Sequence, residues 1–222
     1  MAVILTSLFP KGIPDAIADE MRRIITKRDL FVFIACDFEN KFKTKEYLDE
    51  TLELLSQIGI FFRQEVLIDK EMPAELAQNF IAKADVVWLC GGNTPVQMKW
   101  LKKYRLVSIL QNHTGVLIGL SAGAINLAET AVCSLTCRHS RQEIYPGLGC
   151  VPISPEPHFC ANPVSEELLE LSKSYPLYGM EDESAVFFSN GKLSFFGNIY
   201  KVKNGRAIPV STVGSPFMEF PQ

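Results

Sequence analysis

Short apolar runs that alternate with helix-like segments are the feature that most constrains the fold. Runs of strand length lie at residues 3–6, 30–36, 61–68, 85–90 and 115–120. Apolar residues with a helical period lie between them, at 13–25, 47–58, 74–84 and 94–110, and residues 37–45 are polar enough to predict a loop. Continuous apolar runs are typical of parallel strands that are covered on both faces. The sequence therefore predicts a doubly wound α/β fold, with a mostly parallel sheet and helices on both faces.

The second half of the chain has a different pattern. A short helix is expected at 166–173, and short strands at 177–180, 185–188, 193–196, 200–202 and 207–210. The pairs Asn190-Gly191 and Asn204-Gly205 are typical hairpin turns. These signals predict an antiparallel meander of β-hairpins on one edge of the sheet. Because no linker interrupts the pattern, we expect a single α/β domain over residues 1–222.

Composition and charge narrow the class of protein. The chain has 222 residues, 47% of them hydrophobic, and a net charge of −3 without a basic run, so we expect no nucleic-acid partner. No apolar stretch reaches the ~20 residues of a membrane span, and the start lacks the features of a signal peptide. We therefore expect a cytoplasmic protein with no membrane partner, as a monomer or homodimer.

The six cysteines do not predict a disulfide framework. In a chain of this length they are more typical of buried thiols. Cys133, Cys137 and His139 could suggest a metal site, but no second Cys/His pair has zinc-finger spacing. We expect neither a metal ion nor an organic cofactor.

The strongest motif for chemistry is Gly119-Leu120-Ser121-Ala122-Gly123. An apolar run precedes it and a plausible helix follows it. Strand, tight turn and helix are the context in which G-x-S-x-G forms a nucleophile elbow. In this turn the Ser121 hydroxyl would project at the carboxyl end of the strand. The Ala122 N–H would lie beside it as an oxyanion donor, and the Gly91-Gly92 turn could supply a second donor.

A nucleophilic serine needs a base and an acid that orients the base. Of the three histidines, His113 lies at the amino end of the strand, His139 lies in a polar stretch, and His158 lies in a stiff Pro-rich segment. We favour His158. Acidic candidates for the third group follow the expected strand 177–180, in the run 181–183, and the choice between Asp182 and Glu183 stays open at this point.

The chain resembles the peptidase E (alpha-aspartyl dipeptidase) family of serine peptidases, which is related to cyanophycinase. The motifs that carry the resemblance are Gly91-Gly92-Asn93-Thr94, Gly119 to Ala124, Pro157-His158-Phe159 and Asp182-Glu183-Ser184-Ala185. The resemblance implies the class I glutamine-amidotransferase-like fold. It also implies that Ser121 is the nucleophile, that His158 is the base, and that Gly92 and Ala122 form the oxyanion hole.

Two departures from that family concern the acid and the specificity. The family's aspartate after the nucleophile has no counterpart in 134–137, whereas Glu183 matches a glutamate that serves cyanophycinase-like members, so the resemblance implies a Ser121-His158-Glu183 triad. The family's substrate-binding arginine after the histidine is absent from 159–176. Arg138, Arg141 and Asn93 are the remaining candidates for binding substrate.

The expected function is hydrolysis of short peptides, including dipeptides with N-terminal Asp, through an acyl-enzyme. The alternative is a non-catalytic, small-ligand binding or regulatory member of the same fold.

Overall fold

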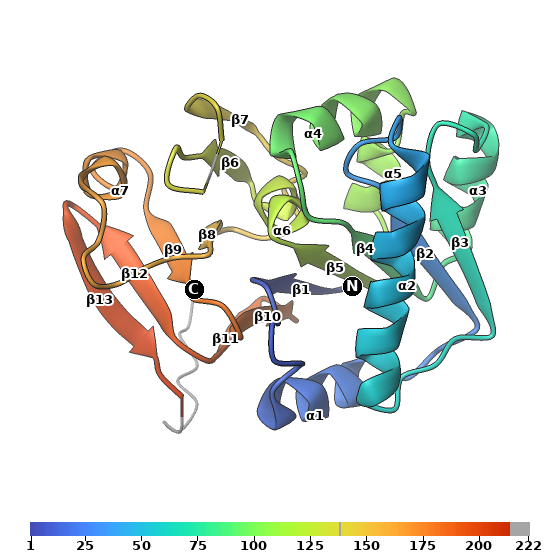
Figure 1. Cartoon of the computed structure of the whole chain (residues 1–222), viewed down its shortest axis with the longest axis horizontal. Coiled ribbons are helices and arrows are strands. Elements are labelled where there is room, and N and C mark those ends of the chain that lie inside the picture. The colour runs from blue at the N-terminus through green and yellow to red at the C-terminus, as the bar shows by residue number, and fades with distance from the viewer. Residues whose placement is uncertain (138, 214–222) are drawn as a thin grey trace.

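A seven-stranded, mostly parallel sheet forms the centre of the protein (Figure 1). The computed structural model describes residues 1–137 and 139–213. Five strands are parallel: β1 (Ala2–Thr6), β2 (Leu30–Ile34), β3 (Gln64–Ile68), β4 (Val86–Leu89) and β5 (Val116–Leu120). β10 (Ala185–Ser189) and β11 (Lys192–Phe196) extend the sheet antiparallel, in the order β11-β10-β1-β5-β4-β2-β3. This confirms the predicted fold class.

Helices cover both faces of this sheet. The helices are α1 (Asp15–Ile24) and α2 (Lys41–Gln57) on one face, and α3 (Ala74–Lys83), α4 (Thr94–Lys103), α5 (Val107–Gln111) and α6 (Ala122–Leu127) on the other. Strand β2 shows why both faces of the sheet are covered, because every residue of this strand is apolar. Phe31 and Phe33 pack with α1 and α2, whereas Val32 and Ile34 pack in the core of the other face. Strands buried on both faces need this composition.

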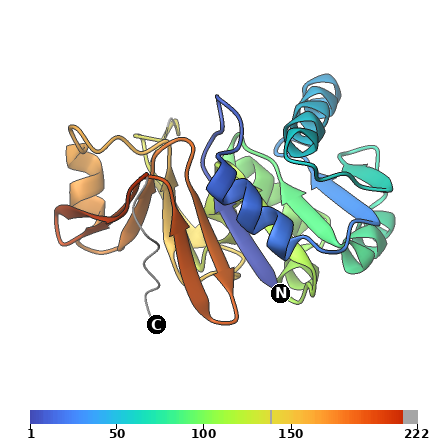
Figure 2. The same ribbon diagram turned by 90° about the horizontal axis from the view of Figure 1, so that it is seen from below.

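A smaller sheet lies at the end of the molecule opposite β3 (Figures 1 and 2). Its four strands are β13 (Arg206–Ser211), β12 (Ile199–Lys203), β9 (Leu177–Met180) and β8 (Ser154–Pro157), in that order, and α7 (Glu166–Leu171) packs beside it. β6 (Thr130–Cys133) and β7 (Glu143–Pro146) form a separate antiparallel pair. The predicted C-terminal antiparallel hairpins are confirmed, as β10 with β11 and β12 with β13. They do not form a meander on one edge of the large sheet, since β10 and β11 join the large sheet while β12 and β13 join the small one.

Two helices differ from the sequence prediction. α2 begins at Lys41, inside the segment expected to be a loop, because Thr44, Leu48, Thr51 and Leu55 recur at helical spacing and are buried. The polar residues between them lie on the solvent side. The predicted helix 94–110 is two helices, which separate at Arg105, where φ is +55°. Within the described residues, no helix combines the length and the hydropathy needed to cross a bilayer.

The carboxyl ends of β1, β5 and β4 lie side by side. Leu89 pairs with Gly119 across β4 and β5, and Thr6 pairs with Leu120 across β1 and β5. Three segments therefore leave the sheet at one place: Ser7 after β1, Ser121 after β5 and Gly91 after β4. Ligands of open α/β sheets bind at this edge.

Candidate active site

Ser121 occupies a strained turn between β5 and α6. Its backbone has φ 49° and ψ −105°, a conformation that residues with a Cβ rarely adopt. Its N–H donates to the Thr6 carbonyl at 3.0 Å, which fixes the turn to β1. The flanking residues must be small, because a Cβ on Gly123 would lie 2.2 Å from the Leu89 carbonyl oxygen, and one on Gly119 would lie 2.6 Å from the Ala124 nitrogen. The turn has the strand–turn–helix geometry of a nucleophile elbow, which the spacing predicts.

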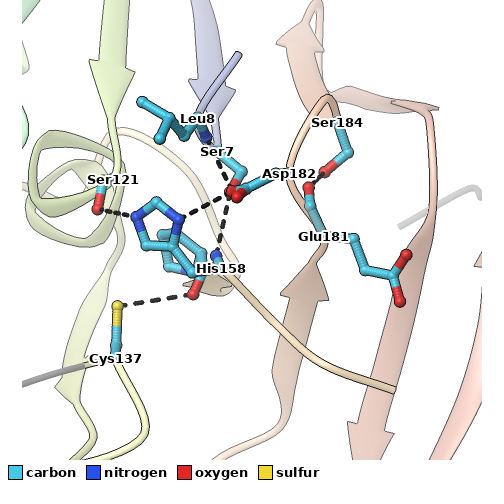
Figure 3. A network of polar contacts seen from close by, with 9 residues as sticks. Ser7, Leu8, Ser121, Cys137, His158, Glu181, Asp182 and Ser184 are labelled. Atoms are coloured by element: carbon cyan, nitrogen blue, oxygen red, sulfur yellow. Dashed lines mark hydrogen bonds and ion pairs between the residues drawn. The ribbon is translucent and has the colours of Figure 1, made fainter. Parts of the chain in front are cut away.

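His158 reaches Ser121 from the small sheet. It follows β8, and its Nε2 lies 2.9 Å from the Ser121 hydroxyl oxygen (Figure 3). The backbone of His158 also has positive φ, at 57°. The next residue anchors it, because Phe159 is buried, donates its N–H to the Met180 carbonyl and packs against Tyr200. Its ring fills the space where Gly179 has no side chain. The structure therefore brings the predicted pair, Ser121 and His158, into hydrogen-bond contact.

The acid that contacts His158 is Asp182. His158 Nδ1 lies 2.8 Å from Asp182 Oδ1 (Figure 3). A carboxylate only accepts hydrogen bonds, so Nδ1 carries the proton, and in the neutral ring Nε2 is free to accept from Ser121. The turn that presents Asp182 follows β9, which pairs in parallel with β8 through Pro157 and Met180. The two loops that leave these strands therefore lie together, as do those of the large sheet.

The expected contact between Glu183 and His158 is not made. Glu183 has φ +65°, and its N–H donates to the Leu8 carbonyl at 2.7 Å. Its carboxylate pairs with Lys11 at 3.5 Å. Successive residues in a turn project differently, and here the turn directs Asp182 to the histidine and Glu183 away from it. The structure thus corrects the sequence expectation by one residue.

A cavity of about 770 Å³ opens beside these three side chains. Its lining comes from α2, the β4–α4 turn, the elbow and nearby loops: Leu8, Tyr47, Glu50, Thr51, Cys90, Gly91, Gly92, Asn93, Leu120, Ser121, Cys137, His139, His158 and Asp182. The volume falls in the range of small-molecule sites. The cavity is the place at which a ligand would meet Ser121.

The Gly91-Gly92 turn lies against the elbow and lines the cavity beside it. A Cβ on Gly91 would lie 3.5 Å from the Ser121 Cβ, so the two backbones are close. Gly92 has φ +138°, and a Cβ there would lie 2.8 Å from Cys36 Sγ, so only glycine fits. Burial raises the pKa of Cys36 and raises that of Cys90 to about 12. Both thiols are therefore protonated at neutral pH and pack beneath this turn, instead of acting as nucleophiles.

Asn93 and Arg141, two of the predicted substrate-binding residues, differ in their position relative to the cavity. Asn93 lines the cavity, but its side-chain oxygen accepts from the Val96 N–H at 3.1 Å and caps α4. Arg141 is not among the residues that line the cavity, and its Nε donates to Glu143 at 2.8 Å. Arg138 lies outside the described residues. Among the described lining residues there is no arginine or lysine.

His139, which lines the cavity, and Glu156 belong to one polar network. His139 bonds Thr94 through Nε2 at 2.8 Å and the Ser134 carbonyl through Nδ1 at 2.9 Å. Ser134 donates its hydroxyl to Glu156, which is fully buried. The second carboxyl oxygen of Glu156 has no hydrogen-bond partner among the described residues. Burial raises the pKa of Glu156 to about 8. The carboxyl two residues before His158 is therefore largely protonated at neutral pH.

Sequence reasoning missed Ser7 and the residues of α2. Ser7 contacts both Asp182 and the His158 backbone, and Tyr47, Glu50 and Thr51 line the cavity. The position of Ser7 directly after a strand was the available signal, since Gly92 and Ser121 were found by the same rule. Within residues 1–137 and 139–213, no group of three or more His, Cys, Asp or Glu side chains could hold a metal ion.

Comparison with known proteins assigns the family. The model of peptidase family S51 matches residues 10–196. The chain belongs to this family of serine peptidases. A similar solved structure is the 1.5 Å crystal structure of a candidate peptidase E protein from Listeria monocytogenes EGD-e. It has 18% sequence identity and a TM-score of 0.66, over 88% of this chain and 97% of that one, and so shares the fold. No curated protein matches the chain.

The buried Glu156 carboxyl predicts a pH-dependent stability. Its pKa is about 8 in the folded state, against an ordinary value near 4.5. The folded protein therefore binds more protons than the unfolded chain between these values, and stability falls as pH rises through them. Glu156→Gln cannot ionise. We expect wild type to lose up to a few kcal/mol relative to this variant between pH 5 and pH 9, since each tenfold change in proton affinity is worth about 1.4 kcal/mol.

Urea unfolding of both proteins at several pH values measures this difference. Glu129→Gln is the matched control, because Glu129 is exposed, and it should follow wild type at every pH. A difference between wild type and Glu156→Gln that does not change with pH would contradict the assignment.

Proposed function

We propose that the protein is a serine peptidase that hydrolyses short peptides through a Ser121-His158-Asp182 triad and an acyl-enzyme. The observation that carries the proposal is the continuous hydrogen-bonded path from Ser121 Oγ through the imidazole to Asp182, at 2.9 and 2.8 Å. The path opens onto the cavity, and the family assignment supports the same chemistry. Nucleophile, base and orienting acid are the components of acyl transfer.

In the first half of the reaction Ser121 attacks the peptide carbonyl. As the bond between Oγ and the carbonyl carbon forms, Nε2 of His158 takes the hydroxyl proton. The Asp182 carboxylate stabilises the imidazolium through Nδ1–H. The imidazolium then protonates the leaving amine as the C–N bond breaks, and the acyl group remains on Ser121.

In the second half a water molecule replaces the amine. His158 takes a proton from the water, whose oxygen attacks the ester carbon, and then returns a proton to Ser121 Oγ as the acid product leaves. We assign the oxyanion to the N–H groups of Ala122 and Gly92. Ala122 is the first residue of α6, and Gly92 belongs to the turn that faces the elbow.

The cavity favours a small substrate that is not acidic near α2. Its volume suits a dipeptide or tripeptide. Among the described lining residues the charged ones are Glu50 and Asp182. The nearby Lys43, which is not a described lining residue, holds its ammonium 5.5 Å from the Tyr47 ring centre. A buried acidic side chain of a substrate would need a cation as partner. We therefore propose that Glu50 faces a cationic group of the peptide, and that aspartyl preference is weak.

Replacement of Ser121 tests the nucleophile. Ser121→Ala keeps the Cβ that the turn accommodates and should leave the melting temperature near that of wild type. Turnover in a dipeptide library should fall by about 10⁴- to 10⁶-fold, because a triad acts as a unit. Hydrolysis by Ser121→Ala at the wild-type rate would exclude a serine mechanism.

Adjacent substitutions test the acid. Asp182→Asn should lower kcat by about 10²- to 10⁴-fold, because the amide cannot stabilise the imidazolium. Glu183→Gln is the matched control and should stay within a few-fold of wild type, since Glu183 contacts Lys11 instead of His158. The opposite order would show that the turn presents Glu183 during catalysis.

Matched substrates test the charge of the cavity. We expect kcat/KM to rank Lys-X and Ala-X dipeptides above Asp-X. Glu50→Gln should lower the ratio of Lys-X to Ala-X by up to about fivefold, as is typical of an exposed ion pair. Glu46→Gln, one turn away on α2 and not in the lining, should leave the ratio unchanged. A strong Asp-X preference would contradict the proposal, and Arg138→Ala and Arg141→Ala would then locate the cation.

A further inference from the structure

Ser7 holds the acid and the base of the site in one arrangement. It follows β1 and is fully buried. Its hydroxyl lies 2.8 Å from Asp182 Oδ1 and 3.0 Å from the backbone nitrogen of His158 (Figure 3). These two partners fix the direction in which the Ser7 hydroxyl donates its proton. The carboxylate can only accept, so Ser7 donates to Asp182, and the His158 N–H donates to Ser7.

Both residues that Ser7 contacts need external support. His158 has a positive φ, which is unfavourable for a residue with a Cβ. Asp182 lies in an exposed turn, and its Oδ1 accepts from three donors: His158 Nδ1, the Ser7 hydroxyl and the Leu8 N–H at 3.3 Å. Two of the three donors come from the segment that leaves β1. That segment connects the large sheet, which carries Ser121, with the small sheet, which carries the other two groups.

The backbone around Ser7 strengthens this connection. The Ser7 N–H donates to the Ser184 carbonyl at 3.2 Å, and the Glu183 N–H donates to the Leu8 carbonyl at 2.7 Å. Residues 7 and 8 thus pair with the turn 182–184 through both main chain and side chain. The main-chain bonds place the turn, and the Ser7 hydroxyl sets the direction of the Asp182 carboxylate.

We propose that Ser7 is a positioning residue for the reaction, which orients Asp182 and His158 through its hydroxyl without touching the substrate. This rests on the proposed serine peptidase function. Because the rate of proton transfer depends on the alignment of the imidazole with Ser121, loss of the Ser7 hydroxyl lowers kcat and leaves substrate binding unchanged. A misplacement of about 1 Å is enough to cost about a hundredfold in rate.

The test measures kcat and KM for p-nitrophenyl acetate. Ser7→Ala should lower kcat by about ten- to a hundredfold and keep KM within about twofold. Ser184→Ala is the matched control. Ser184 is also fully buried in the same region and donates its hydroxyl to the Glu181 carbonyl, without contact to His158 or Asp182 (Figure 3). It should keep kcat within about threefold of wild type, and a kcat of Ser7→Ala in that same range would overturn the proposal.

A double substitution separates positioning from general loss of structure. In the Asp182→Asn background, one of the two groups that Ser7 orients has lost its charge, so Ser7→Ala should lower kcat by a smaller factor than it does in the wild-type background. Equal losses in both backgrounds would overturn the proposal. If Ser7→Ala does not fold, Ser7→Cys keeps the shape with a weaker donor and should lower kcat about tenfold. Wild-type kcat in Ser7→Cys would overturn the proposal as well.

The Ser121→Ala variant shows whether a negative result concerns the role of Ser7 or the serine mechanism itself. If Ser121→Ala retains wild-type activity, the serine mechanism itself fails. If it is inactive while Ser7→Ala is fully active, the mechanism stands and only the role of Ser7 is wrong.

Discussion

The close packing of α6 against β4 is the constraint on which the site depends. The Leu89 carbonyl comes so near to Gly123 that a Cβ there would lie 2.2 Å from its oxygen. This contact lets α6 begin directly after β5, with Ser121 at a positive φ between the two elements. Without it the chain would need a longer turn, and the hydroxyl would not project at the sheet edge. The strain at Ser121 is offset by the packing of the small residues on each side of it.

In both sheets, neighbouring parallel strands bring residues of the site together at their carboxyl ends. β1, β5 and β4 are parallel neighbours, so Ser7, Ser121 and Gly91 leave the large sheet together. β8 and β9 are parallel neighbours in the small sheet, so His158 and Asp182 also leave together. The hydrogen bonds from Ser121 to His158 and from Ser7 to Asp182 join the two groups. The proposed catalytic unit therefore forms only when both sheets are folded and in contact.

Much of the large sheet could be predicted from the sequence, because strands covered on both faces are apolar throughout and helices have a clear period. Ser121 could be predicted from the small residues around it, and His158 from the prolines before it. Asp182 could not be separated from Glu183, since the direction of a side chain in a turn depends on φ and ψ, which the sequence does not state. The partition of the last hairpins between two sheets depends on long-range pairing, and no local pattern reports it.

Covalent labelling tests most directly whether His158 activates Ser121 as a nucleophile. The protein is treated with a fluorophosphonate at neutral pH, and the adduct is located by mass spectrometry of its peptides. We expect one adduct per chain, on Ser121, and no adduct at the same exposure when His158 is replaced by Ala. An unlabelled wild-type protein, or an adduct on another residue, would show that His158 does not activate Ser121.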